Sequence, residues 1–169
     1  MWNETDFPLG YLITFRCRGT WLHGDERGST DRHHHVYRAP HIAPNRQWHA
    51  FNRGILKFDP VTLTAKQRDS VERAITETCE HRRWRLRALE AQTNHVHVVA
   101  SIGETKPALA LNAFKANATR QMRQDGNWAD DVSPWADKGS ERYLWNERSL
   151  TLAVDYVLNG QGGPLPDFD

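Results

Sequence analysis

Alternating apolar and polar residues predict a series of β-strands in this chain. In the first of them, Tyr11, Ile13 and Phe15 fall on one face of an extended segment, while Thr14 and Arg16 fall on the other. Near the middle of the chain, two further segments are joined by a short turn and are expected to pair as neighbours. The predicted strands span residues 9–18, 54–58, 84–89, 95–102 and 141–145.

Apolar residues spaced three and four apart predict helices at 64–83, 105–126 and 147–159. Each helix has its own start signal: the Thr64–Gln67 capping box, Thr105 followed by Pro107, and Asn146. This order of elements favours an α+β layer fold, in which an antiparallel or mixed sheet carries its helices on one face. We expect one domain over residues 1–169, with a long, histidine-rich excursion at about 19–53.

Composition predicts an ordinary cytoplasmic protein. Hydrophobic residues make up 38% and charged residues 25%, and no apolar run approaches the roughly 18 residues that a membrane span needs. The first residues are acidic and lack an apolar leader segment. Cys17 and Cys79 are expected to be reduced, buried thiols. The net charge is only +1, but basic residues exceed acidic ones between residues 16 and 57, which is compatible with phosphate contact.

His95 and His97 stand two positions apart in a β-branched run, so both imidazoles face the same side of a strand, while Val96 and Val98 face the core. Imidazole is a common metal ligand, and this pair looks like half of a metal site. The plain alternative is two histidines on a half-buried strand that bond to their neighbours.

Tyr156 lies on the predicted last helix, beside an apolar stripe of Leu150, Val154, Val157 and Leu158. A tyrosine in this place is most often a packing residue. Its phenol is a weak nucleophile near neutral pH because its ordinary pKa is about 10, and a metal-activated phosphate would change that.

The segment at 93–99, the basic helix after it, and the Tyr156–Asn159 segment together resemble the single-tyrosine HUH transposases. The likeness is to the REP-associated tyrosine transposases and the IS200-like family, and it runs from about Tyr11 to Gln161. It implies a ferredoxin-like sandwich with an antiparallel sheet of four to five strands. It also implies that His95 and His97 bind Mg²⁺ or Mn²⁺, and that Tyr156 cuts single-stranded DNA near a hairpin through a 5′-phosphotyrosine link.

The chain departs from the family pattern at the third metal ligand. Related enzymes carry Gln or Asn one helical turn after the tyrosine, where this chain has Gly160. Gln161 is the favoured substitute and Asn159 the other candidate. If neither reaches the ion, the protein would be a noncatalytic module that binds hairpin DNA or RNA.

Four basic residues are expected to contact the DNA backbone, because phosphate binding needs fixed positive charge: Lys115, Arg120, Arg123 and Arg148. The protein would act as a monomer or as a homodimer that exchanges its tyrosine helix. Two other interpretations stay open: a zinc site around His33–His35, and a sheet-based RNA-binding protein. The second leaves the histidine pair unexplained.

Overall fold

The computed structural model describes residues 6–19, 60–160 and 165–168. The expected strand at 54–58, the segment His33–His35 and Gln161 lie outside these ranges, and so does most of the excursion at 19–53.

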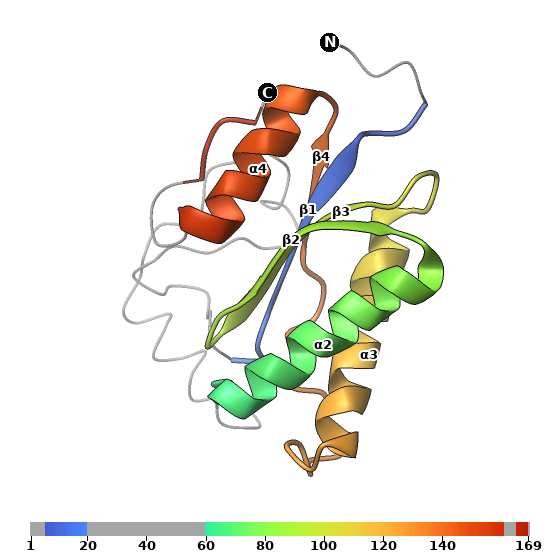
Figure 1. Ribbon diagram of the computed structural model, residues 1–169. Coiled ribbons are helices and arrows are strands. Elements are labelled where there is room, and N and C mark those ends of the chain that lie inside the picture. The colour runs from blue at the N-terminus through green and yellow to red at the C-terminus, as the bar shows by residue number, and fades with distance from the viewer. Residues whose placement is uncertain (1–5, 20–59, 161–164, 169) are drawn as a thin grey trace.

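One four-stranded antiparallel sheet forms the centre of the described chain, in the order β2-β3-β1-β4 (Figure 1). Its strands are β1 (Gly10–Arg16), β2 (Arg85–Ala91), β3 (His95–Ser101) and β4 (Ser140–Leu144). The expected pairing of the two central segments is confirmed, since β2 and β3 are antiparallel neighbours. The histidine strand β3 is internal, lying between β2 and β1.

The helices are α2 (Ala65–Arg82), α3 (Pro107–Gln124) and α4 (Glu147–Asn159). The Thr64–Gln67 capping box is present, because the Gln67 backbone N–H donates to Thr64 Oγ1 at 3.2 Å and the Thr64 N–H donates to Gln67 Oε1 at 2.9 Å. Asn146 also caps α4 as predicted, its Oδ1 accepting from the Ser149 N–H at 2.9 Å.

The expected cap of α3 is wrong by one residue. Lys106, not Thr105, is the N-cap, and it makes no side-chain cap bond. The reason is Pro107, which occupies the first helical position and keeps the residue before it in an extended conformation.

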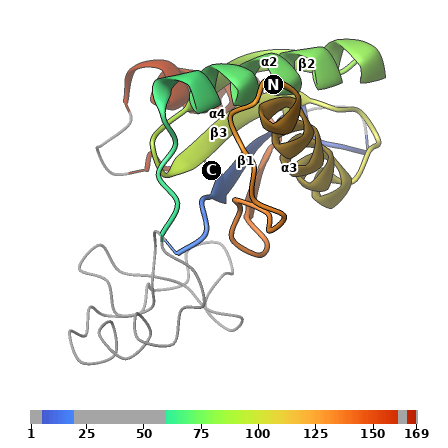
Figure 2. The ribbon, with the colours of Figure 1, turned by 90° about the horizontal axis from the view of Figure 1, so that it is seen from below.

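The order from β1 to β4 is βαββαβ, and the first strand inserts beside the third, which is the ferredoxin-like arrangement. The predicted α+β fold is therefore confirmed. Helices α2 and α3 pack against each other on one side of the sheet (Figure 2). Their core joins Phe15, Val96 and Val98 of the sheet to Ile75 and Phe114 of the helices.

The expectation that all helices share one face holds for α2 and α3 and is wrong for α4. Helix α4 packs on the opposite face, against Leu12, Val99 and Leu144 (Figure 1). The physical reason is that the central strands are apolar on both sides: Leu12 is 1% and Val99 0% exposed, so the second face also needs a cover.

Cys17 and Cys79 are buried thiols outside any disulfide, as predicted, and burial raises the pKa of Cys17 to about 12. Among the helices described, none is long and apolar enough to cross a bilayer.

Candidate active site

His95 and His97 lie next to each other on the sheet face that α4 covers. Their ring centroids are 4.7 Å apart, and His97 is only 6% exposed. The strand alternation therefore does what the sequence predicted: it turns both imidazoles to one side and packs Val96 and Val98 on the other.

Each imidazole is held through its Nδ1 atom. His97 Nδ1 lies 2.7 Å from Thr14 Oγ1, on the residue directly opposite in β1. His95 Nδ1 lies 2.6 Å from Asn94 Oδ1, which can only accept, so the proton is on Nδ1. With Nδ1 as the donor, His95 carries its lone pair on Nε2, and a hydrogen bond donated by His97 Nδ1 to Thr14 would do the same for His97, as metal-binding histidines require.

Burial of His97 keeps it neutral. Desolvation, aided by the neighbouring His95, lowers the pKa of His97 to about 3, well below its ordinary value. Only neutral imidazole can donate a lone pair to a cation. Two imidazoles, at least one of them neutral at pH 7, fit a divalent transition-metal ion as part of its ligand shell.

Tyr156 reaches the histidine pair from α4. Its ring lies 5.5 Å from that of His97, centroid to centroid, at an interplanar angle of 69°. Burial raises the pKa of the Tyr156 phenol, while the positive charge of Arg142 acts in the opposite direction. The structure thus brings together the three residues that the sequence singled out on two distant segments.

The expected position of Tyr156 on α4 needs a correction. Tyr156 is 9% exposed and lies within the buried stripe, whereas Leu158, placed in that stripe from the sequence, is 53% exposed. The helix faces the sheet through Leu150, Ala153 and Val157. Rotation of the helix toward this side carries the tyrosine inward and Leu158 into solvent.

The third metal ligand stays a prediction. Asn159 is exposed and its Nδ2 donates to Asp155 Oδ1 at 3.0 Å. Gly160 ends α4, with its N–H donating to the carbonyl oxygen of Tyr156 at 3.0 Å. Gln161, the favoured candidate, is outside the described residues.

In a comparison with known protein families, residues 57–148 match the family described as transposase, IS200 like. This chain belongs to the IS200-like transposase family. The match covers more than half of the transposase and includes His95 and His97, but it ends before Tyr156. Divalent metal ions are used in this family in general.

Two solved structures share the fold of this transposase. One is a REP-associated tyrosine transposase bound to a REP hairpin, with a TM-score of 0.51 and 14% identity over 93% of this chain and 70% of that one. The other is described as a transposase from Deinococcus radiodurans R1, with a TM-score of 0.50 and 11% identity over 94% of this chain and 95% of that one. A search of curated proteins finds no match.

Three of the four expected DNA-contact residues lie across the sheet from the histidine pair, on α3. Lys115 Nζ donates to the carbonyl oxygens of Ala136, at 3.0 Å, and Lys138, so it anchors the segment before β4. Arg123 donates to the carbonyl oxygens of Asp130 and Asp131. Arg120 is exposed on α3, and Arg148 is exposed on α4. Their contact with DNA stays a prediction.

Two arginines that the sequence analysis did not choose share the face of the histidine pair. Arg16 is the direct cross-strand partner of His95, and Arg142 pairs with Leu12 on the next strand. Both are half-buried. The alternation in β1 puts Arg16 on the other face of the strand from Tyr11, and this pattern in the sequence could have identified Arg16 as a site residue. Arg142 depends on the register of β4, which only the fold supplies.

Proposed function

We propose that this transposase cuts single-stranded DNA with Tyr156 as the nucleophile and a divalent ion, Mg²⁺ or Mn²⁺, held by His95 and His97. The observation that carries the proposal is the contact between the His97 and Tyr156 rings, 5.5 Å apart. One phosphodiester can lie against both groups when they are this close, which is the positioning that a nucleophile needs.

The chemical step is a displacement at phosphorus. The phenolic oxygen of Tyr156 forms a bond to phosphorus, and the bond from phosphorus to the 3′ oxygen breaks. The phenol proton is lost to solvent, and the departing oxygen takes up a proton to become a 3′-hydroxyl. The 5′-phosphotyrosine keeps the energy of the bond, so a second strand can be joined without ATP.

The bound ion would neutralise charge that develops on the phosphoryl oxygens. Side chains of the protein would orient the imidazoles, the phenol and the phosphate. Thr14 and Asn94 fix the two imidazoles through their Nδ1 atoms. Arg142 acts electrostatically on Tyr156 and adds positive charge where the phosphate would lie. Packing of Tyr156 between α4 and the sheet limits its rotamers and restricts the access of water to it.

The expected substrate is single-stranded DNA beside a hairpin. The similar fold of a REP-associated tyrosine transposase, solved with a REP hairpin, supports this choice. An unpaired segment is expected because the scissile phosphate must reach a phenol that is mostly buried against the sheet, and a single strand is narrower than a duplex.

The test is a covalent adduct. The substrate is a hairpin oligonucleotide with single-stranded extensions at both ends and a label at its 3′ end. It is incubated with the protein and Mn²⁺, and the products are run on a denaturing gel. We expect a labelled protein band that is absent with chelator and absent in Tyr156→Phe. The matched control is Tyr143→Phe, which removes a hydroxyl from an exposed tyrosine on β4 and should leave the adduct intact.

A noncatalytic hairpin-binding module is the second candidate. Gly160 favours it, because a glycine stands where related enzymes carry an amide ligand. Hairpin binding by the unaltered chain without any adduct, at every ion tested, would select this candidate over the nuclease.

A further inference from the structure

The pairing of β2 with β3 places two further polar residues beside the histidine pair. Glu90 is the direct cross-strand partner of His97. Gln92 lies opposite His95, since its backbone N–H donates to the His95 carbonyl oxygen at 2.8 Å across the turn at residues 93–94. Directly opposed residues of antiparallel strands point to the same face of the sheet. Glu90 and Gln92 therefore share the face of His95 and His97, and both are partly buried.

The packing of β2 supports this assignment of faces. Ala88, two residues before Glu90, packs in the cluster of Val99 and α4, whereas Leu89 packs on the other side of the sheet, against the core of α2 and α3. Strand alternation then returns Glu90 and Gln92 to the side of α4. Opposed residues in such a pair have Cβ atoms roughly 5 Å apart, so the side chains of Gln92 and His95 are long enough to reach one ion between them.

A hydrogen bond to Glu90 sets which way the Gln92 amide is turned. Gln92 Nε2 donates to Glu90 Oε1 at 2.8 Å, because a carboxylate oxygen accepts and only the amide nitrogen can donate. The nitrogen is thereby held by Glu90, and Gln92 Oε1 is left to accept from another group. Among the described residues, the bond to Glu90 is the side-chain hydrogen bond that Gln92 makes.

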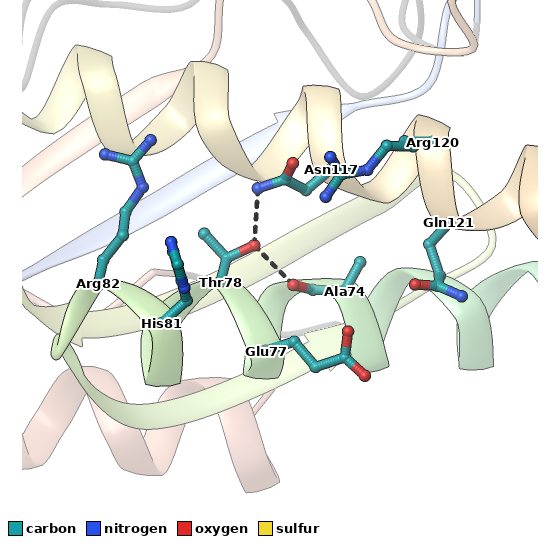
Figure 3. A pocket seen from close by; sticks show the side chains of 8 residues that line it. All are labelled: Ala74, Glu77, Thr78, His81, Arg82, Asn117, Arg120 and Gln121. Carbon is teal, nitrogen blue, oxygen red and sulfur yellow. Dashed lines mark hydrogen bonds between the residues drawn. The ribbon is translucent and has the colours of Figure 1, made fainter.

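Other amides of the described chain are engaged elsewhere. Asn117 lies across the sheet from the histidine pair, where its Nδ2 donates to Thr78 Oγ1 at 2.9 Å between α2 and α3 (Figure 3). Asn94 Oδ1 accepts from the Nδ1 of His95 and so holds that ring. Asn159 is exposed on α4. Gln92 is thus well placed to offer an amide oxygen on the histidine face of the sheet.

We propose that Gln92 Oε1 is a ligand of the divalent ion, in place of the amide that is absent at Gly160, and that Glu90 is the positioning residue of this ligand. The inference rests on the proposed function, which puts the ion at the histidines. Mg²⁺ and Mn²⁺ favour oxygen ligands, so a site with two imidazoles gains from a carbonyl oxygen beside them. A ligand from β2 builds the metal site from one pair of strands, and α4 then contributes Tyr156 alone.

The experiment measures Mn²⁺ affinity without DNA, by the electron paramagnetic resonance signal of the free ion. All proteins carry Tyr156→Phe, so the result does not depend on whether the chain cuts DNA. Gln92→Leu keeps the approximate size of the side chain but has no ligand atom. We expect its dissociation constant for Mn²⁺ to rise about tenfold or more, since loss of even an indirect partner of a metal costs about 10- to 100-fold. Gln92→Glu, which offers a carboxylate oxygen, should retain the affinity of the parent protein.

A second pair of variants tests the positioning role of Glu90. Glu90→Leu and Glu90→Gln both remove the negative charge, but only Glu90→Gln keeps an oxygen that can accept from the Gln92 amide. We expect Glu90→Leu to bind Mn²⁺ more weakly than Glu90→Gln does. Equal affinities of the two variants would contradict the positioning role.

The matched control is Gln124→Leu, which removes an exposed amide at the end of α3 and should leave Mn²⁺ affinity unchanged. Gln161→Leu tests the competing ligand. Parent affinity in Gln92→Leu, or a loss in Gln161→Leu that Gln92→Leu does not share, would overturn the inference and leave the histidine site standing. Full Mn²⁺ affinity in His95→Ala with His97→Ala would contradict the proposed function and, with it, this inference. Melting temperatures of all variants show whether they are folded.

Discussion

His97 and Tyr156 lie in edge-to-face contact across the boundary between the sheet and α4, with ring centroids 5.5 Å apart. Their contact depends on α4 packing on the face of the sheet that α2 and α3 leave uncovered. The same packing places Arg142 within electrostatic range of the phenol.

Loss of the histidine pair should separate cutting from binding. In His95→Ala with His97→Ala, we expect the rate of adduct formation to fall by about a thousandfold or more, because the ion that neutralises the phosphoryl group has no site. Hairpin affinity should fall by less than about tenfold, since the contacts to the DNA backbone supply most of it. Equal losses of both, with a lower melting temperature, would assign the histidines a folding role.

The hydroxyl of Thr14 should tune metal affinity. In Thr14→Val the shape is kept but His97 Nδ1 loses its partner at 2.7 Å. We expect Mn²⁺ to bind about 10- to 100-fold more weakly in a titration, with the loss restored in Thr14→Ser. Nitrogen NMR of the imidazole should also show a change of tautomer. A Thr14→Val protein with unaltered Mn²⁺ affinity would contradict the orienting role.

Loss of the Arg142 charge should lower the rate of adduct formation more than it lowers the affinity for the hairpin. At saturating hairpin, adduct formation in Arg142→Gln is expected to be about a hundredfold slower, because a fixed positive charge beside the reacting phosphate is lost. Arg142→Lys should recover part of the rate. Lys106→Gln removes one exposed cation at the start of α3 and serves as the control. A similar rate for Arg142→Gln and Lys106→Gln would refute this assignment.

One chain should supply both halves of the site. Tyr156 contacts the His97 of its own chain, so mixing Tyr156→Phe with the double histidine variant should give no adduct. Restored activity in the mixture would show instead that two subunits exchange α4, and gel filtration of the active species would then report a dimer.

Asp125 should stabilise the fold in a pH-dependent way. Hydrogen bonds from Ser70 and then Arg73, both at 2.6 Å, lower the pKa of this carboxyl. Its stabilisation is therefore complete above its unfolded pKa of about 4 and is lost as the pH falls below that value. We expect Asp125→Asn to melt at a lower temperature than the unaltered chain at pH 7, with the difference shrinking toward pH 3.

The control for this prediction is Asp69→Asn, which removes the exposed partner of the same arginine. Exposed ion pairs contribute little to stability, so at pH 7 the melting temperature of Asp69→Asn should fall less than that of Asp125→Asn. If the difference in melting temperature between Asp125→Asn and the unaltered chain stays constant from pH 7 to pH 3, the stabilisation does not depend on the ionisation of Asp125, and the prediction is wrong.

Much of the candidate site could be predicted from local sequence because its parts obey local rules. A strand places residues i and i+2 on one side, which was enough to put His95 and His97 together. Capping residues marked the starts of α2 and α4 for the same reason. The cap of α3 was misplaced because a following proline overrides a good capping side chain.

The parts that were missed depend on contacts between distant segments. Arg142 joins the site through the register of β4 on β1, and Thr14 through its pairing with His97. The rotation of α4 that buries Tyr156 and exposes Leu158 reflects the shape of the sheet surface beneath it. A helical wheel shows which residues of a helix share a face, but it holds no information on the surface against which the helix packs.

The sequence by itself determined four of the five predicted strands, the three helices, the shared face of the two histidines and the presence of a tyrosine on the last helix, because backbone periodicity and capping act over a few residues. Only the tertiary structure decided that α4 covers the second face of the sheet and brings Tyr156 to His97. Helix α4 packs there because burial of Leu12 and Val99 stabilises the folded chain. These two residues form a common apolar surface only after their strands have paired.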